Sequence, residues 1–241
     1  VKVSGKEALV RIHNTNTKKI IHARFPLDDG MAAVDGTLAV PGVAGTGAPV
    51  RLEFLEPGGA TTGKLLPTGN VVDTLDVPGV GTVRCSIVDA ANACVLVPAL
   101  VLGLKGTEMP DEIDSSPHIL KTLAAIRIAA SIRLGIAKNV EEAAKRSVPL
   151  VGFVCEPTDA KLLSGAQLSR NDVDLTARMI SNGQPHRALP ITASLCITVA
   201  SRIEGTVVHE ATRATSNPDG ELRIGMPSGT LVAAATVRCR S

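Results

Sequence analysis

The chain has 241 residues, of which 44% are hydrophobic and 20% are charged, and its formal net charge is +2. This composition is typical of a globular protein with a full core, and so small a charge gives no reason to predict binding to nucleic acid or to an anionic membrane. Trp and Tyr are absent and Phe occurs three times, so the aromatic platforms that stack on single-stranded bases are missing.

The first quarter of the chain predicts β-structure. Residues 8–14 and 18–25 are rich in apolar and β-branched side chains, and the turn-forming run 14–17 joins them into a hairpin. Residues 31–49 are rich in Gly, Pro and Ala, which predicts a surface loop. In 50–55 apolar and charged side chains alternate, which predicts a strand with one buried face.

The middle of the chain predicts a mixture of strands and helices. They are a strand over 82–89, a strand over 94–98, a helix over 117–134, a short helix over 139–145 and a buried strand over 148–155. The long helix begins with Pro, which fits the first helical position because the N–H there has no partner within the helix.

The last third predicts a helix from Asn171 to about Ser181 and a second helix over 191–203. The second helix carries small and apolar side chains all round, which indicates burial inside a closely wrapped sheet. Strands are expected over 205–213 and 221–237, with a turn at 217–220. The fold class is therefore α+β, with a curled sheet around a central helix.

One pattern occurs twice, at 10–21 and at 222–233. Each copy opens with an apolar residue followed by Arg-Ile, passes through a small polar turn and returns along an apolar strand. The repeat suggests two copies of one building block, with the cleft between them as the expected place of function.

The five cysteines are scattered and no pair has the CxxC spacing of a metal site; they are Cys85, Cys94, Cys155, Cys196 and Cys239. We expect reduced thiols in a cytoplasmic protein, since no secretory leader precedes the first strand. No apolar run reaches the roughly 18 residues of a membrane span. Both ends look cut, which suggests part of a longer polypeptide.

The loop and helix start at 183–194 are the strongest site candidate. A helix N-terminus presents free N–H groups, and the small residues from Thr192 to Ser194 leave room for an anion to reach them. His186 and Arg187 add a titratable group and a bidentate partner for a carboxylate. The alternative stays open that Thr192 only caps the helix and that the two basic residues are solvated.

Two further turns are weaker candidates. Asn92 follows an apolar strand, where an amide can hold a substrate carboxylate or can close an Asx turn. Ser228 lies in the run 226–230, which can equally be only a tight turn. No nucleophile elbow, phosphate-binding loop, dinucleotide fingerprint or zinc-helix motif is present.

Several collinear runs together resemble one family, PrpF, which comprises 2-methylaconitate and aconitate isomerases, with methylitaconate isomerase and oxalomesaconate tautomerase as relatives. The runs are 10–19, 41–47, 53–57, 62–73, 87–94, 178–187, 205–210 and 226–230. The run TGKLLPTGNVVD at 62–73 is the longest of them and is not generic.

The resemblance implies a diaminopimelate-epimerase-like fold of two β-barrel domains, each around a central helix. In this chain the first domain, 1–84, would be incomplete and the second would span 85–241. The family needs no cofactor or metal and shifts a double bond in a small di- or tricarboxylate. The resemblance implies a cytoplasmic role in propionate metabolism and leaves a homodimer open, with neither nucleic acid nor membrane as partner.

The chain departs from the family pattern at the catalytic groups. The acid–base lysine and the cysteine of a Gly-Asn-Cys-Gly-Asn motif belong to the family's first central helix and the segment before it, and neither motif occurs in this chain. No catalytic residue is therefore assigned here, and neither Cys94 nor Cys196 is given that role. Ile191 and Thr192 stand where epimerases carry a second cysteine, which disfavours a two-cysteine epimerase.

What carries over is the half of the site that holds the substrate carboxylate. Asn92 matches the asparagine of the wider superfamily's Gly-Asn-Pro-His motif, and 191–194 match the start of the second central helix. The expected substrate-binding residues are Asn92, His186, Arg187, Thr192, Ser194 and Ser228. The main hypothesis is an isomerase of an unsaturated di- or tricarboxylate, and the alternative is a carboxylate-binding remnant without turnover.

Overall fold

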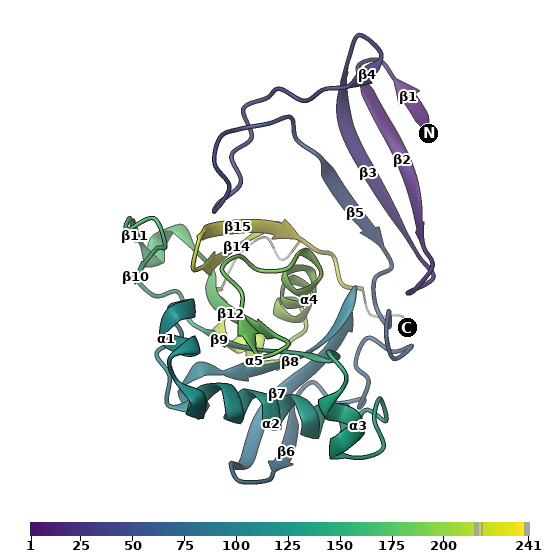
Figure 1. The fold of residues 1–241 in the computed structure, drawn as a ribbon. Helices are drawn as coiled ribbons and strands as arrows, with labels where there is room; N and C mark the ends of the chain where they lie inside the picture. The colour runs from purple at the N-terminus through teal and green to yellow at the C-terminus, as the bar shows by residue number, and fades with distance from the viewer. Residues whose placement is uncertain (215–216, 218, 239–241) are drawn as a thin grey trace.

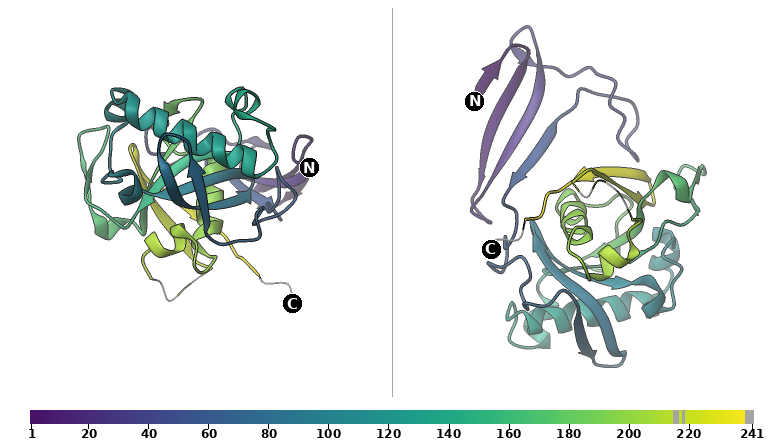
Figure 2. Two further views of the ribbon diagram at one scale, coloured as in Figure 1. Left: turned by 90° about the horizontal axis from the view of Figure 1, so that it is seen from below. Right: turned by 180° about the vertical axis from the view of Figure 1, so that it is seen from behind.

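The computed structural model describes residues 1–214, 217 and 219–238, and it contains two main sheets. Figure 1 shows the N-terminal sheet standing to one side of a larger sheet, which curls around a central helix. The views in Figure 2 show the same separation of the two parts from below and from behind.

The N-terminal sheet has five antiparallel strands, in which β1 to β4 follow one another and β5 pairs with β3. The strands are β1 (Lys2–Ser4), β2 (Glu7–Asn14), β3 (Lys19–Asp28), β4 (Met31–Ala32) and β5 (Arg51–Leu55). The β2–β3 turn is closed by the side chain of Asn14, whose Oδ1 accepts a hydrogen bond from Asn16 N at 3.0 Å. The predicted N-terminal hairpin is therefore confirmed.

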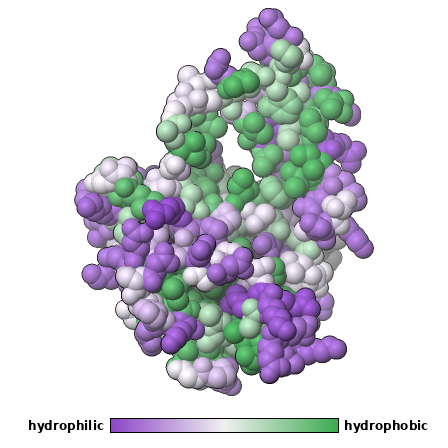
Figure 3. Space-filling view, viewed as in Figure 1, coloured by the Kyte–Doolittle hydropathy of each residue, from purple (hydrophilic) through white to green (hydrophobic). Residues whose placement is uncertain are grey.

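Side chains alternate across this sheet. The register places Ile12 opposite Ile21 and Ile21 opposite Phe54, so one face is apolar, while Arg24 and Glu53 lie on the other and form an ion pair at 3.2 Å. Little covers the apolar face within the described residues. Ile12 remains 41% exposed, and Figure 3 shows apolar side chains gathered on this part of the surface.

The larger sheet has the strand order β15-β14-β12-β9-β8-β7-β6, with β13 paired to β12. The strands are β6 (Asp73–Val77), β7 (Gly81–Ala90), β8 (Asn92–Pro98), β9 (Leu150–Cys155), β12 (Leu175–Ser181), β13 (Gln184–Pro185), β14 (Glu221–Met226) and β15 (Gly229–Ala234). The pairs β8–β9 and β12–β14 are parallel and the others are antiparallel.

The remaining elements cover both faces of this sheet. They are η1 (Ala99–Leu102), α1 (Pro110–Asp114), α2 (Pro117–Arg133), α3 (Val140–Ala144), β10 (Ala160–Lys161), β11 (Gln167–Leu168), η2 (Arg170–Asp172), α4 (Ile191–Ser201) and α5 (Val207–Ala211). Helix α4 lies inside the curl and α2 crosses the outside (Figure 1). None of the helices in the described part combines the length and hydrophobicity needed to cross a bilayer.

The larger sheet therefore has a core on each side. Ile197 of α4 packs with Val88 and Met179 inside the curl, whereas Ile126 of α2 packs with Phe153 outside. The predictions for the long surface helix, for the short helix capped by Asn139 and for the buried central helix are confirmed. Strand β7 illustrates the double burial, because neighbouring residues along it enter different cores.

Two predicted elements are wrong. Residues 171–181 were expected to form a helix, but Asn171 lies in η2 and the following residues form β12. Strand β12 is buried on both faces, so it lacks the apolar–polar alternation that marks a half-exposed strand. Residues 205–213 were expected to form a strand, but they contain α5, because Thr206 caps that helix through a hydrogen bond from His209 N.

The two sheets are joined by the segment between Leu55 and Asp73. The expected domain boundary at 84/85 falls inside β7, which pairs with β6 in the larger sheet. The second predicted hairpin is β14–β15, and it is shorter than the expected 221–237. The expected turn at 217–220 contains Pro218, and one of the five cysteines of the sequence is Cys239. Both residues lie outside the described part of the chain.

Candidate functional site

The N-terminus of α4 supplies unsatisfied backbone donors. Pro190 stands at the N-cap and offers no side-chain cap, while the N–H of Ser194 is the first to bond within the helix, to Pro190 O at 2.9 Å. No partner for the amides of the first turn occurs among the described residues, so an anion can bind them, and the helix dipole favours one there. Thr192 is half-buried and does not cap the helix, contrary to the structural alternative.

Strand β7 leads toward this end of α4, and Asn92 is the first residue of the next strand, β8. The hydroxyl of Ser86 accepts a hydrogen bond from Val207 N at 3.0 Å, beyond the C-terminus of the helix. Further along the strand, Val88 O accepts a hydrogen bond from Cys196 Sγ, at 3.2 Å, in the middle of the helix. The strand thus runs antiparallel to α4, and the β7–β8 turn with Asn92 lies toward the helix N-terminus.

The β14–β15 turn reaches the same end. Leu189, just before α4, donates its N–H to the sulfur of Met226 at 3.3 Å, which brings the turn containing Ser228 beside the helix start. The hydroxyl oxygen of Ser228 is buried and has no hydrogen-bond partner in the described chain. A buried hydroxyl without a partner is costly, so this oxygen is poised for a ligand or a water.

The long loop of the N-terminal sheet lies over the β14–β15 turn. A Cβ at Gly42 would lie 2.9 Å from the Cβ of Ser228, and a Cβ at Gly229 would lie 2.9 Å from the Cβ of Pro41. Gly42 has φ +87°, so both its conformation and its close contact require glycine. Figures 1 and 2 show the loop descending to this turn.

The other predicted residues are placed less favourably. Ser194 donates its hydroxyl to Ile191 O at 2.8 Å, so that proton is already used within the helix. Arg187 is exposed and pairs with Asp111 of α1 at 3.0 Å, which competes with any role toward a substrate. His186 is half-buried with its Nε2 unpartnered among the described residues, and burial lowers its pKa below the ordinary value.

Two buried thiols lie at α4, that of Cys196 on the helix and that of Cys94 on β8. The neighbouring Cys196 thiol and complete burial raise the pKa of Cys94 well above its ordinary value. The Cys94 thiol therefore stays protonated at neutral pH, which agrees with assigning it no nucleophilic role. No group of three His, Cys, Asp or Glu suited to a metal occurs in the described part of the chain.

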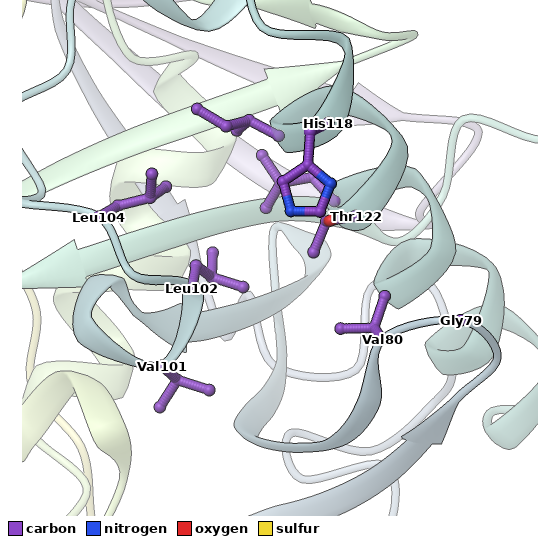
Figure 4. Close-up of a pocket in the computed structure, with 9 residues that line it drawn as sticks. Gly79, Val80, Val101, Leu102, Leu104, His118 and Thr122 are labelled. Atoms are coloured by element: carbon purple, nitrogen blue, oxygen red, sulfur yellow. The ribbon is translucent and has the colours of Figure 1, made fainter.

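A separate hollow of about 200 Å³ lies between η1 and α2. Figure 4 shows His118 and Thr122 of α2 there, with Leu102 on one side and Val80 on the other. Its lining is largely apolar and includes no Arg or Lys. It therefore offers a carboxylate neither an Arg nor a Lys, nor the uncapped backbone N–H donors found at the start of α4.

Sequence reasoning missed Asp89, which is completely buried near the end of β7. Its Oδ2 accepts hydrogen bonds from Thr61 N at 2.8 Å and from Thr62 N at 2.6 Å. A lone carboxylate in the apolar run IVDA was the available sign, because an acidic residue is rarely buried without a specific partner.

The family model described as PrpF protein matches residues 4–239. The chain belongs to the PrpF family. Among curated relatives, the 3-methylitaconate isomerase of Eubacterium barkeri is 39% identical over 98% of this chain and 63% of that protein. The 2-methyl-aconitate isomerase of Cupriavidus necator is 38% identical over 93% of this chain and 57% of that protein.

Solved structures agree with the PrpF assignment. Methylitaconate-delta-isomerase superposes with a TM-score of 0.90 at 38% identity, covering 99% of this chain and 62% of that one. A hydroxyproline epimerase from Agrobacterium vitis superposes with a TM-score of 0.52 at 14% identity, which shows a shared fold alone. The diaminopimelate-epimerase-like fold class is thereby confirmed, and the chain spans less than two thirds of the length of these PrpF relatives.

Proposed function

We propose that the complete protein is a cofactor-independent isomerase that shifts a double bond in a small unsaturated di- or tricarboxylate. The observation that carries the proposal is the uncapped N-terminus of α4, flanked by the turns of Asn92 and Ser228. It is supported by the PrpF relatives, which are named as isomerases of methylitaconate and 2-methyl-aconitate.

The proposed reaction depends on stabilising the negative charge that develops on the substrate. Removing a proton beside a carboxylate places negative charge on carbon, and resonance moves that charge onto the carboxylate oxygens. Fixed N–H donors at the start of α4, aided by the Asn92 amide, stabilise this charge without having to reorient. The proposal places the acid–base lysine and cysteine of the family outside these 241 residues. The chain's own contribution is to bind and orient the carboxylate.

The test is isomerisation by the complete protein. trans-Aconitate, 2-methylaconitate and methylitaconate are incubated with it separately, and ultraviolet absorbance follows the change in conjugation. We expect turnover of at least one of them. Tight binding of all three without turnover would instead support the alternative, a carboxylate-binding protein that lacks catalysis. If none of the three is bound or turned over, the proposal of a carboxylate site is rejected.

The role of Asn92 is tested by Asn92→Ala in the complete protein. Losing a hydrogen bond to a charged carboxylate costs about 1.5–3 kcal/mol, so we expect KM to rise by about tenfold or more. Asn70→Ala is a matched control, because Asn70 also lies in a turn but donates to Asp73 at 3.2 Å, within a local structure. An equal rise of KM in both variants would remove Asn92 from the site.

We also propose a cytoplasmic location, supported by the four described cysteines, all of which are free. A place in propionate metabolism depends on 2-methylaconitate being the substrate. A homodimer is a further proposal, and light scattering on the complete protein tests it.

A further inference from the structure

The complete burial of the Asp89 side chain costs free energy, because a carboxylate loses its hydration there. Its side chain is 0% exposed, and no cation forms an ion pair with it in the described part of the chain. Its Oδ2 accepts three hydrogen bonds, from Thr61 N at 2.8 Å, Thr62 N at 2.6 Å and Thr62 Oγ1 at 2.8 Å, while Oδ1 is buried without a partner among the described residues. A buried carboxylate is tolerated only where such bonds offset its desolvation.

The hydrogen-bond donors come from the connection between the two sheets. This connection lies along the edge of β7, because Gly59 N donates to Asp89 O at 2.7 Å and Asp89 N donates to Leu65 O at 2.9 Å. The N-terminal sheet reaches the same loop, since Lys19 Nζ donates to Gly58 O at 2.8 Å. The carboxylate therefore closes a loop that fastens the N-terminal sheet to the larger one.

The same contacts fix the turn that carries Asn92. Ala91, immediately before it, has φ +62°, which is strained for a residue with a Cβ. Its N–H donates to Pro57 O at 2.9 Å, in the connecting segment. The strained turn is thus held by the segment that Asp89 anchors.

We propose that Asp89 is a positioning residue, whose carboxylate clamps 57–65 to the end of β7 and thereby sets the place of Asn92 relative to the α4 amides. This rests on the proposed function, since the role of Asn92 is part of it. The clamp acts through Asn92 and through the loop of the N-terminal sheet, and Asp89 itself touches no substrate.

Asp73 provides a matched control. It is also a buried aspartate, 3% exposed, and it accepts hydrogen bonds from Thr68 Oγ1 at 2.8 Å and Asn70 Nδ2 at 3.2 Å. These bonds close a local turn before β6 and do not reach Asn92. Asp73→Asn and Asp89→Asn therefore each replace the carboxyl of a buried aspartate by an amide. Only Asp89→Asn changes the contacts with 57–65.

Two measurements on the complete protein test the proposal. The first is amide hydrogen exchange of Thr61 and Thr62, which needs no activity. The second is the Kd for tricarballylate, a saturated tricarboxylate, together with KM and kcat for whichever substrate the wild type turns over. For Asp89→Asn we expect faster exchange at both amides and a rise of about tenfold in Kd and KM, with a smaller change in kcat.

The outcomes separate this proposal from the function on which it rests. Wild-type protein that neither binds nor turns over carboxylates rejects the proposed function, and the exchange measurement still decides on the clamp. Unchanged exchange in Asp89→Asn, or an equal rise of Kd in Asp73→Asn, overturns the clamp. If Asp89→Asn fails to fold, Thr62→Val removes only the hydroxyl bond, and an unchanged Kd in that variant also overturns it.

Discussion

At the residue scale, His186 couples stability to pH. Burial lowers the pKa of its imidazole below the ordinary value of about 6.5, so the unfolded chain binds a proton at a pH where the folded chain does not. Stability is therefore lost as the pH falls below the unfolded pKa. We predict that the wild type loses more unfolding free energy than His186→Gln between pH 7.5 and pH 5.5, in urea denaturation. Parallel losses in the two proteins would contradict it.

Asp174 gives a dependence of the same sign, but in a more acidic range. Burial alone would raise the pKa of its carboxyl, but hydrogen bonds from Arg223, including one of 2.7 Å from Nη2 to Oδ1, outweigh burial and lower it. A lowered carboxyl pKa contributes stability above the unfolded value of about 3.9, and that contribution is lost as the pH falls through the folded value.

We predict that Asp174→Asn lowers the free energy of unfolding at pH 7 by about 1–2 kcal/mol, since it weakens a charge-assisted pair that is partly exposed. The difference from wild type should narrow as the pH falls from 7 through the folded pKa of the wild-type carboxyl, because that carboxyl takes up a proton there. Chemical denaturation over a series of acidic pH values measures it. Asp159→Asn, in a more exposed pair with Arg170, should have a smaller effect at pH 7.

At the element scale, Thr206 decides the structure of 205–213. Its hydroxyl donates to Ala200 O at 2.7 Å and accepts from His209 N at 3.0 Å, so it joins the end of α4 to the start of α5. We predict that Thr206→Val destabilises the protein by about 1–2 kcal/mol, because the N–H of His209 loses its cap and Ala200 O loses one of its hydrogen bonds. Thr206→Ser keeps the hydroxyl and should lose less, and thermal unfolding compares them.

The capping residue also explains the error in this region. The run GTVVHEAT is rich in β-branched residues, which favours a strand, yet Thr206 is the N-cap of the five helical residues that follow it. Strand β12 shows the reverse error, since its apolar residues on both faces cannot be told from a buried helix by periodicity alone. For α5 the cap decided between two locally acceptable structures, whereas for β12 the pairing with β9 did so.

At the scale of the whole molecule, the two sheets differ in burial. Ala8 and Ala23 are the buried apolar residues of the N-terminal sheet among those described, whereas β8 and β9 lie between two cores. We predict that amides of β2 and β3 exchange with solvent faster than those of β8 and β9 in this 241-residue chain, because local opening exposes less apolar surface there. Equal protection in native-state hydrogen exchange would contradict it.

The sequence by itself determined the features that short-range patterns encode. Helix α2 began at its proline, α4 was recognised as buried from its small apolar residues, and both hairpins followed from their turns. The family runs also identified the segments of Asn92 and Ser228. These features depend on residues close together in the chain, so composition and spacing suffice.

The tertiary structure alone decided which of these segments meet. Asp89 bonds Thr62 across 27 positions, and Cys196 of α4 bonds the end of β7 across 108. It also brought Arg187 to Asp111 across 76 positions. Such outcomes depend on the competition among partners that are distant in sequence, and no local periodicity records which partner a buried polar group will find.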